Sequence, residues 1–209
     1  MITHRPTATD PEPRSPLDGV LRGHGATMAI RHGRCVAAHF GSAASETAVC
    51  LRTVGIADRS ERTTFELRGA PGDIDEALAA LGRSDATAWW ARTTARTAIV
   101  RCEYVDAARC GAAVHFAEGT LAIDVSSRYA AIGVIGPLAE DLLRAAALEE
   151  GDGRPSVMRD RQGALELLVD AREAERVWAR LLEAGAPFRV ACVGLDALEH
   201  LAASHRFPM

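Results

Sequence analysis

Lysine is absent from this chain of 209 residues, and all 24 basic residues are therefore arginines. This absence excludes chemistry that needs a lysine amine from the chain itself. A Schiff base to pyridoxal or to a carbonyl substrate needs that amine, and so does the phosphate-binding loop of the Walker A type. Enzymes of those classes are excluded unless another chain supplies the lysine.

The chain also lacks long apolar runs and the cysteine spacing of metal or redox motifs. No run reaches about 18 apolar residues, which predicts that no helix spans a membrane. The start lacks the charged, apolar and small-residue order of a signal peptide. The cysteine count is odd and CxxC is missing, which is typical of reduced thiols and predicts a cytoplasmic protein. The cysteines are Cys35, Cys50, Cys102, Cys110 and Cys192.

Neither nucleic acid nor a metal ion is indicated as a ligand. The net charge of −4 gives no electrostatic reason to expect nucleic-acid binding. His24, His32 and His39 lie in one region, but no histidine pair has a tight metal-type spacing with a carboxylate between. A surface or core role is therefore favoured for these histidines over metal binding.

Two similar stretches, at about residues 55–80 and 122–145, predict a duplicated αβ unit. Each contains a short strand pattern, a turn with Gly and Pro, and an amphipathic helix pattern. The alternative is a chance match. The first stretch includes IADRSERTTFELRGAPGDIDEAL and the second IDVSSRYAAIGVIGPLAEDLL, so that Asp58, Ser60 and Arg62 fall on Asp124, Ser126 and Arg128.

The remaining patterns predict an α+β fold of antiparallel sheets with helices on one face. Residues 1–14, rich in Pro, Thr and charge, predict a tail before a single domain at 15–209. Thr27–Ile30 and Cys35–Phe40 predict a hairpin, and Phe188–Val193 a strand. Trp89 and Trp90 are expected to fill the core rather than to form an exposed stacking pair.

Three segments, taken in order, resemble the folate-binding domain of the glycine-cleavage T-protein, the aminomethyltransferase. ETAVCLRTVGIADRS at 46–60 is similar to the family's E-x-x-A-V-R-x-x-V-G-L-x-D-x-S run. The second repeat is similar to the strand that leads into its Q-G-P-x-A turn, and the last 26 residues before Met209 are similar to its closing helix. The resemblance implies the same fold, with tetrahydrofolate in a pocket between the repeats.

The resemblance also implies a site for the folate. In the family the last glutamate of R-x-G-Y-T-G-E-x-G-x-E holds the pterin, and RDRQGALE at 159–166 is a shortened counterpart ending at Glu166. Glu166, Arg62 and Arg159 are therefore the expected folate-binding residues. Alternation places Glu166 on the strand face opposite Leu165 and Leu167, and a solvent-facing glutamate is the alternative.

Departures from the family leave three functions open. The family's G-G-x-x-D-D strand has no counterpart between Ala86 and Cys102, so the catalytic residue is unknown. The first hypothesis is a folate-binding protein of the aminomethyltransferase class. The second is an accessory subunit similar to the gamma subunit of multi-subunit sarcosine oxidases, which RSPL at 14–17 also resembles. The third is a binder of another small planar ligand. The family's C-terminal barrel has no counterpart before Met209, so we expect a partner subunit or a homo-oligomer to cover an apolar surface.

Overall fold

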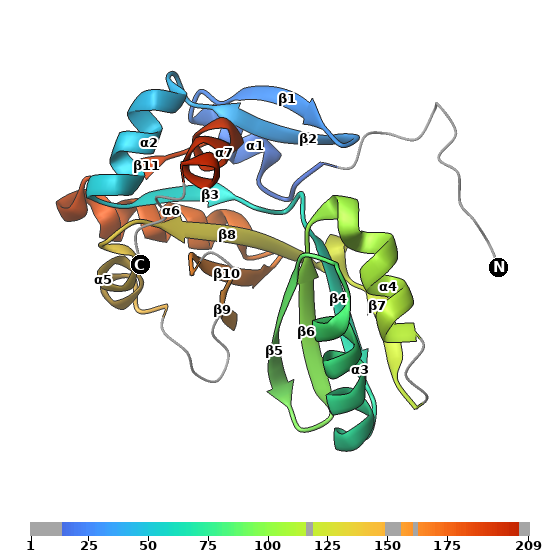
Figure 1. Cartoon of the computed structure of the whole chain (residues 1–209). Helices are drawn as coiled ribbons and strands as arrows, with labels where there is room; N and C mark the ends of the chain where they lie inside the picture. The colour runs from blue at the N-terminus through green and yellow to red at the C-terminus, as the bar shows by residue number, and fades with distance from the viewer. Residues whose placement is uncertain (1–13, 116–118, 149–155, 161–162, 205–209) are drawn as a thin grey trace.

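The computed structural model describes residues 14–115, 119–148, 156–160 and 163–204. The expected tail, except for Arg14, lies outside the described residues. Helices and strands alternate irregularly along the chain, in an α+β arrangement (Figure 1). In chain order the elements are α1 (Asp18–Gly23), β1 (Thr27–Arg31), β2 (Arg34–His39), α2 (Ala43–Arg52), β3 (Gly55–Asp58), β4 (Thr63–Arg68), α3 (Pro71–Arg83), β5 (Ala88–Thr94), β6 (Thr97–Cys102), η1 (Tyr104–Asp106), α4 (Ala107–His115), β7 (Leu121–Asp124), η2 (Ser126–Arg128), β8 (Tyr129–Ile135), α5 (Ala139–Ala145), β9 (Ser156–Arg159), β10 (Leu165–Asp170), α6 (Ala174–Gly185), η3 (Ala186–Phe188), β11 (Ala191–Cys192) and α7 (Leu195–Ala203).

The strands form two sheets and a separate hairpin. The large sheet has the order β11-β3-β8-β10-β9, and the small sheet has the order β5-β6-β4-β7. Every pair of neighbours is antiparallel except β11 and β3, which are parallel. The β1–β2 hairpin turns at His32 and Gly33, both with positive φ (51° and 76°), as a two-residue turn requires.

Helices cover both faces of the large sheet, where we expected one. Helices α1, α5 and α6 pack on one face around the fully buried Trp178, while α2 and α7 pack on the other. The reason lies in β8, which is buried at six consecutive positions from Ala130 to Ile135. Such a continuous apolar run belongs to a strand that is covered on both faces. The small sheet is covered by α3 and α4 on one face.

The duplicated αβ unit is present, and its two copies cross between the sheets. The first copy runs from β3 in the large sheet to β4 in the small sheet and then α3. The second runs from β7 in the small sheet to β8 in the large sheet and then α5. The crossing brings β3 beside β8 and β4 beside β7.

The repeated Asp-x-Ser motif ties the two copies to each other. Ser60 N donates to Asp58 Oδ1 over 3.0 Å, and Ser126 N donates to Asp124 Oδ1 over 2.9 Å. Each serine hydroxyl then accepts a backbone N–H from the other copy. Ala131 N donates to Ser60 Oγ over 3.1 Å, and Thr64 N donates to Ser126 Oγ over 3.0 Å. The motif residues therefore stabilise the crossing of the two copies.

Two local expectations differ from the structure. The expected strand Phe188–Val193 is reduced to the two residues of β11, because the η3 turn continues from α6 and Arg189 adopts a left-handed conformation (φ 55°). The two tryptophans of β5 point to opposite faces of the sheet. Trp89 is 6% exposed and lies in the core, whereas Trp90 is 39% exposed, so the expectation of two core indoles is correct for Trp89 alone.

The partly buried Asp58 predicts a pH dependence of stability. Burial raises the pKa of Asp58 from its ordinary value of 3.8 to about 6, against the hydrogen bonds from Ser15 and Ser60, which lower it. The folded protein therefore holds this proton more tightly than the unfolded chain does. The contribution of Asp58 to the free energy of unfolding falls as the pH rises from 3.8 to about 6, and it stays lower above that range.

The variant Asp58→Asn should remove that fall, because the amide keeps an acceptor for Ser60 but does not ionise. Urea unfolding of both proteins at several pH values between about 4 and about 7 measures the difference. The variant should gain stability relative to the wild type as the pH increases. Asp124→Asn, at the exposed copy of the motif, is the matched control. Parallel curves for Asp58→Asn and the wild type would contradict the prediction.

Candidate functional site

Glu166 lies at the junction of the two sheets, deep in the protein. It is the second residue of β10, between Gly133 of β8 and Met158 of β9, and it is 2% exposed. Leu165 and Leu167 face the helices on the other side of the strand, as alternation predicts. The alternative of a solvent-facing glutamate is therefore wrong.

An arginine of the same chain already binds the Glu166 carboxylate. Arg101 Nη2 donates to Glu166 Oε1 over 2.6 Å and also to Arg59 O over 2.8 Å. Its Nη1 donates to Thr64 Oγ1 over 2.5 Å. Arg101 lies on β6 of the small sheet and is 2% exposed, so the pair joins the two sheets in the interior. The sequence signal was available, because an arginine interrupts the apolar strand Thr97–Cys102 at an inward position, but we did not predict a role for Arg101.

Arg62 is the second cation beside Glu166. Its Nη1 lies 3.7 Å from Glu166 Oε1 and 3.4 Å from Asp160 Oδ2, and its Nη2 lies 2.8 Å from Glu103 Oε1. The guanidinium carbon stands 4.5 Å from the centre of the Trp89 ring, a distance at which cation–π attraction acts. The structure thus brings together two of the three expected folate-binding residues, Glu166 and Arg62.

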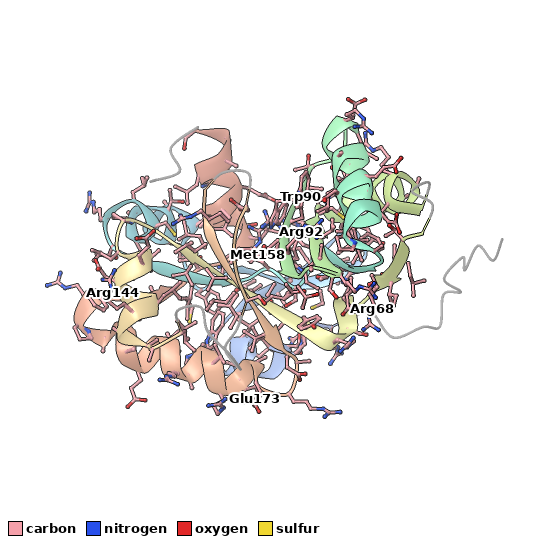
Figure 2. The ribbon with its side chains drawn as sticks, turned by 90° about the horizontal axis from the view of Figure 1, so that it is seen from below. Arg68, Trp90, Arg92, Arg144, Met158 and Glu173 are labelled. Atoms are coloured by element: carbon pink, nitrogen blue, oxygen red, sulfur yellow. The ribbon has the colours of Figure 1, made fainter. Side chains whose placement is uncertain are left out.

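Arg159, the third expected residue, lies elsewhere. Its Nη2 pairs with Glu140 Oε1 of α5 over 2.5 Å, and its side chain is 59% exposed. Alternation in β9 separates it from the junction: Met158 points between the sheets and packs with Trp89, so Arg159 points to the opposite face. Figure 2 shows Met158 near the centre of the molecule.

The charges of this buried cluster stabilise one another. Burial opposes ionisation of Glu166, yet Arg101 and Arg62 hold its pKa below the usual value. Burial likewise lowers the pKa of Arg62, but the surrounding carboxylates, Glu166 and Glu103 first, raise it overall. Glu166 and Arg62 therefore stay charged at neutral pH. Such paired groups hold a structure together, and they are poor proton donors or acceptors for catalysis.

Three polar atoms of the cluster are buried without a hydrogen-bond partner among the described residues. They are Glu166 Oε2, Arg101 Nε and Trp89 Nε1. A buried polar group without a partner costs free energy, so a water molecule or a ligand group is the usual partner at such a place. Within the described part of the chain, no group of three or more His, Cys, Asp or Glu is arranged to hold a metal ion.

The overall arrangement matches solved structures of two kinds. One is the glycine cleavage system aminomethyltransferase T from Bartonella henselae, at a TM-score of 0.69 and 16% identity. The match covers 90% of this chain and 61% of that one, so the chain spans less than two thirds of the aminomethyltransferase. The chain has the T-protein fold.

A second T-protein-like neighbour is smaller. It is one chain of the heterotetrameric sarcosine oxidase from Corynebacterium sp. U-96, at a TM-score of 0.51 and 18% identity. The match covers 71% of this chain and 93% of that one. No protein-family model and no curated protein matches the sequence. No helix among the described residues is long and apolar enough to cross a membrane.

The Arg101–Glu166 pair predicts strong coupling between its two positions. Arg101→Met or Glu166→Leu alone leaves a buried charge without its main partner and should cost about 3–5 kcal/mol of unfolding free energy. The double variant removes both charges and should be more stable than the sum of the single effects predicts. Urea unfolding of all four proteins gives the coupling.

The exposed pair of Arg159 and Glu140 provides the matched control for this double-mutant cycle. Arg159→Met and Glu140→Leu should each alter the free energy of unfolding by less than about 1 kcal/mol. Additive effects of Arg101→Met and Glu166→Leu would show that the buried pair is not coupled.

Proposed function

We propose that this chain is a non-catalytic subunit that uses the T-protein fold to bind another protein, in an assembly of the sarcosine oxidase type. The observation that carries the proposal is the Arg101–Glu166 ion pair. In this fold the glutamate at this place is the expected receptor for a pterin, and here the carboxylate is already bound inside the protein.

The residues at the junction do not fit a pterin in the observed conformation. A carboxylate that receives the pterin edge must accept two N–H groups side by side. Arg101 presents its guanidinium N–H to Glu166 Oε1, and Arg62 lies beside it. A pterin would have to displace Arg101, which also donates to Arg59 O and Thr64 Oγ1. The arrangement therefore supports no one-carbon chemistry at Glu166.

Two observations support a protein partner. The structural match covers 93% of one chain of a heterotetrameric enzyme. Large apolar side chains are also exposed on its surface, among them Ile30, Trp90 and Leu121, at 48%, 39% and 58%. Aromatic and other apolar residues of this kind are enriched in the centres of protein interfaces. A second copy of the chain is the competing partner.

Tetrahydrofolate binding is the second candidate function. The observation in its favour is the buried Glu166 Oε2, which has no partner among the described residues and could accept an N–H from a ligand. This candidate requires Arg101 to move away on binding, at the cost of the buried ion pair.

Calorimetry with tetrahydrofolate distinguishes the two candidates. Under our proposal the wild type shows no saturable heat, and Glu166→Gln behaves identically. If folate is a ligand held by Glu166, the wild type binds and Glu166→Gln loses about 1.5–3 kcal/mol, or about 10- to 150-fold in affinity. Arg159→Gln is the control, because Arg159 lies outside the cluster. Folate binding by the wild type would overturn the proposal.

Co-expression tests the partner directly. When the chain is produced together with the proteins encoded by adjacent genes, it should elute with one of them as a complex of fixed stoichiometry. Light scattering of the chain alone at micromolar concentration provides the comparison. A chain that stays monomeric alone and in every co-expression would contradict the proposed role, and a stable homodimer would favour the second copy.

A further inference from the structure

A cleft of about 220 Å³ opens beside the buried cluster. It lies between the turn of the β1–β2 hairpin, helix α7, the η1 turn and the segment that joins β3 to β4. Charged side chains line one part of it and apolar side chains the other. It is smaller than the clefts of about 300–1,000 Å³ that hold drug-sized ligands, so its size suits a small molecule.

Arg59 reaches this cleft from the interior. It is 7% exposed, and its side chain lies across Gly133 of β8, where an added Cβ would come within 3.1 Å of Arg59 Cγ. Its Nε donates to Glu61 Oε1 over 2.8 Å. The two terminal nitrogens, Nη1 and Nη2, donate to no group within the described residues, and neither is among the fully enclosed unpartnered atoms. The space left to them is the cleft, which Arg59 lines.

The other two arginines of the cleft differ from Arg59. Arg31 Nη2 pairs with Asp196 Oδ1 over 3.2 Å at the rim, with 41% of its side chain exposed. The terminal nitrogens of Arg62 both point to carboxylates, those of Glu103, Asp160 and Glu166. Arg59 is thus the buried arginine whose terminal N–H groups remain available for a ligand.

An aromatic ring and a helix also line the cleft. The Tyr104 ring is stacked with His32, at 6.4 Å between ring centres and 28° between planes. The guanidinium carbon of Arg34 lies 5.0 Å from the centre of the same ring. These two contacts hold a partly exposed Tyr104 in place. Leu198 and Ala202 of α7 complete an apolar surface.

We propose that this cleft binds a small organic monocarboxylate, with the carboxylate on Arg59 and an apolar, planar body against Tyr104 and α7. A guanidinium presents two parallel N–H groups that match the two oxygens of a carboxylate. The pairing is strengthened where the arginine is withdrawn from water. Glu61, Glu103 and Glu199 also line the cleft, and their charges disfavour dianions such as sulfate. The inference does not rest on the proposed subunit role, because Arg59, unlike Glu166, belongs to the lining of this cleft.

Sodium benzoate is the probe for this site, because it joins one carboxylate to a flat apolar ring. Isothermal calorimetry at constant ionic strength should show saturable binding with one site per chain. Benzamide, the neutral counterpart of the same shape, should bind at least about 10-fold more weakly, and sodium sulfate should not compete.

Variants assign the binding to Arg59. Arg59→Gln should weaken benzoate binding by about 10-fold or more, and Arg59→Lys, which keeps the charge but not the fork, should lie between. Arg159→Gln is the matched control, at an exposed arginine outside this cleft, and it should bind as the wild type does. Thermal unfolding of each variant shows whether the fold is retained. If Arg59→Gln does not fold, the benzoate affinity of Arg59→Lys is compared with that of the wild type instead.

Three results would each overturn the proposal. The first is wild-type protein without saturable benzoate binding. The second is equal affinity for benzoate and benzamide, which would remove the carboxylate from recognition. The third is unchanged benzoate affinity in folded Arg59→Gln, which would move the site away from this arginine. The calorimetry with tetrahydrofolate concerns Glu166 and decides none of these three results. The proposed function and the monocarboxylate proposal can therefore fail separately.

Discussion

The ion pair of Arg101 and Glu166 is the interaction on which the junction of the two sheets depends. Each partner comes from a different sheet, and both are 2% exposed. A buried charge is costly unless it is paired and hydrogen-bonded, so the small sheet can pack here only with Arg101 facing Glu166. The same arginine donates to Arg59 O and Thr64 Oγ1, which ties the chain segment between β3 and β4 to the same point. Packing between the sheets adds an apolar layer around Trp89, Ile99 and Leu168.

The duplicated unit explains why charges gather at this junction. Both copies cross from one sheet to the other, and the crossing residues belong to the loops after β3 and β7. Arg62 and Arg128 occupy matching positions in these loops, yet their surroundings differ. Arg62 has 5% of its side chain exposed among three carboxylates, whereas Arg128 has 57% exposed and lies 3.6 Å from Glu66. The difference arises because the sheets close over one loop and leave the other at the surface. The two arginines therefore hold matching positions in the chain, and tertiary packing gives them different surroundings.

Local patterns predicted the elements of this fold better than its contacts. The repeated Asp-x-Ser stretch, the hairpin turn at His32 and Gly33 and the inward face of Glu166 could all be read from spacing, because each depends on residues close in sequence. The partner of Glu166 could not, since Arg101 lies 65 residues away and a glutamate in a strand carries no information about the opposing sheet. Arg159 shows the same limit. Arg159 is the first residue of the segment that resembles the family's pterin-binding motif, and this position suggested that it binds folate. Strand alternation instead directs its side chain to Glu140 of α5.

The fold alone therefore does not determine the ligand. This chain has the T-protein fold, and yet Arg101 on β6 binds the carboxylate of Glu166, which the resemblance marked as the expected pterin-binding residue. An arginine side chain in an apolar strand is retained only where a carboxylate compensates it, so Arg101 and Glu166 are each required by the presence of the other. Once they are paired, Glu166 Oε2 and Arg101 Nε are the atoms of the pair that lack a hydrogen-bond partner among the described residues. The terminal N–H groups of Arg59, which lines the neighbouring cleft, have no acceptor among the described residues. Under our proposal an anion binds in that cleft and leaves the contacts between the sheets unbroken.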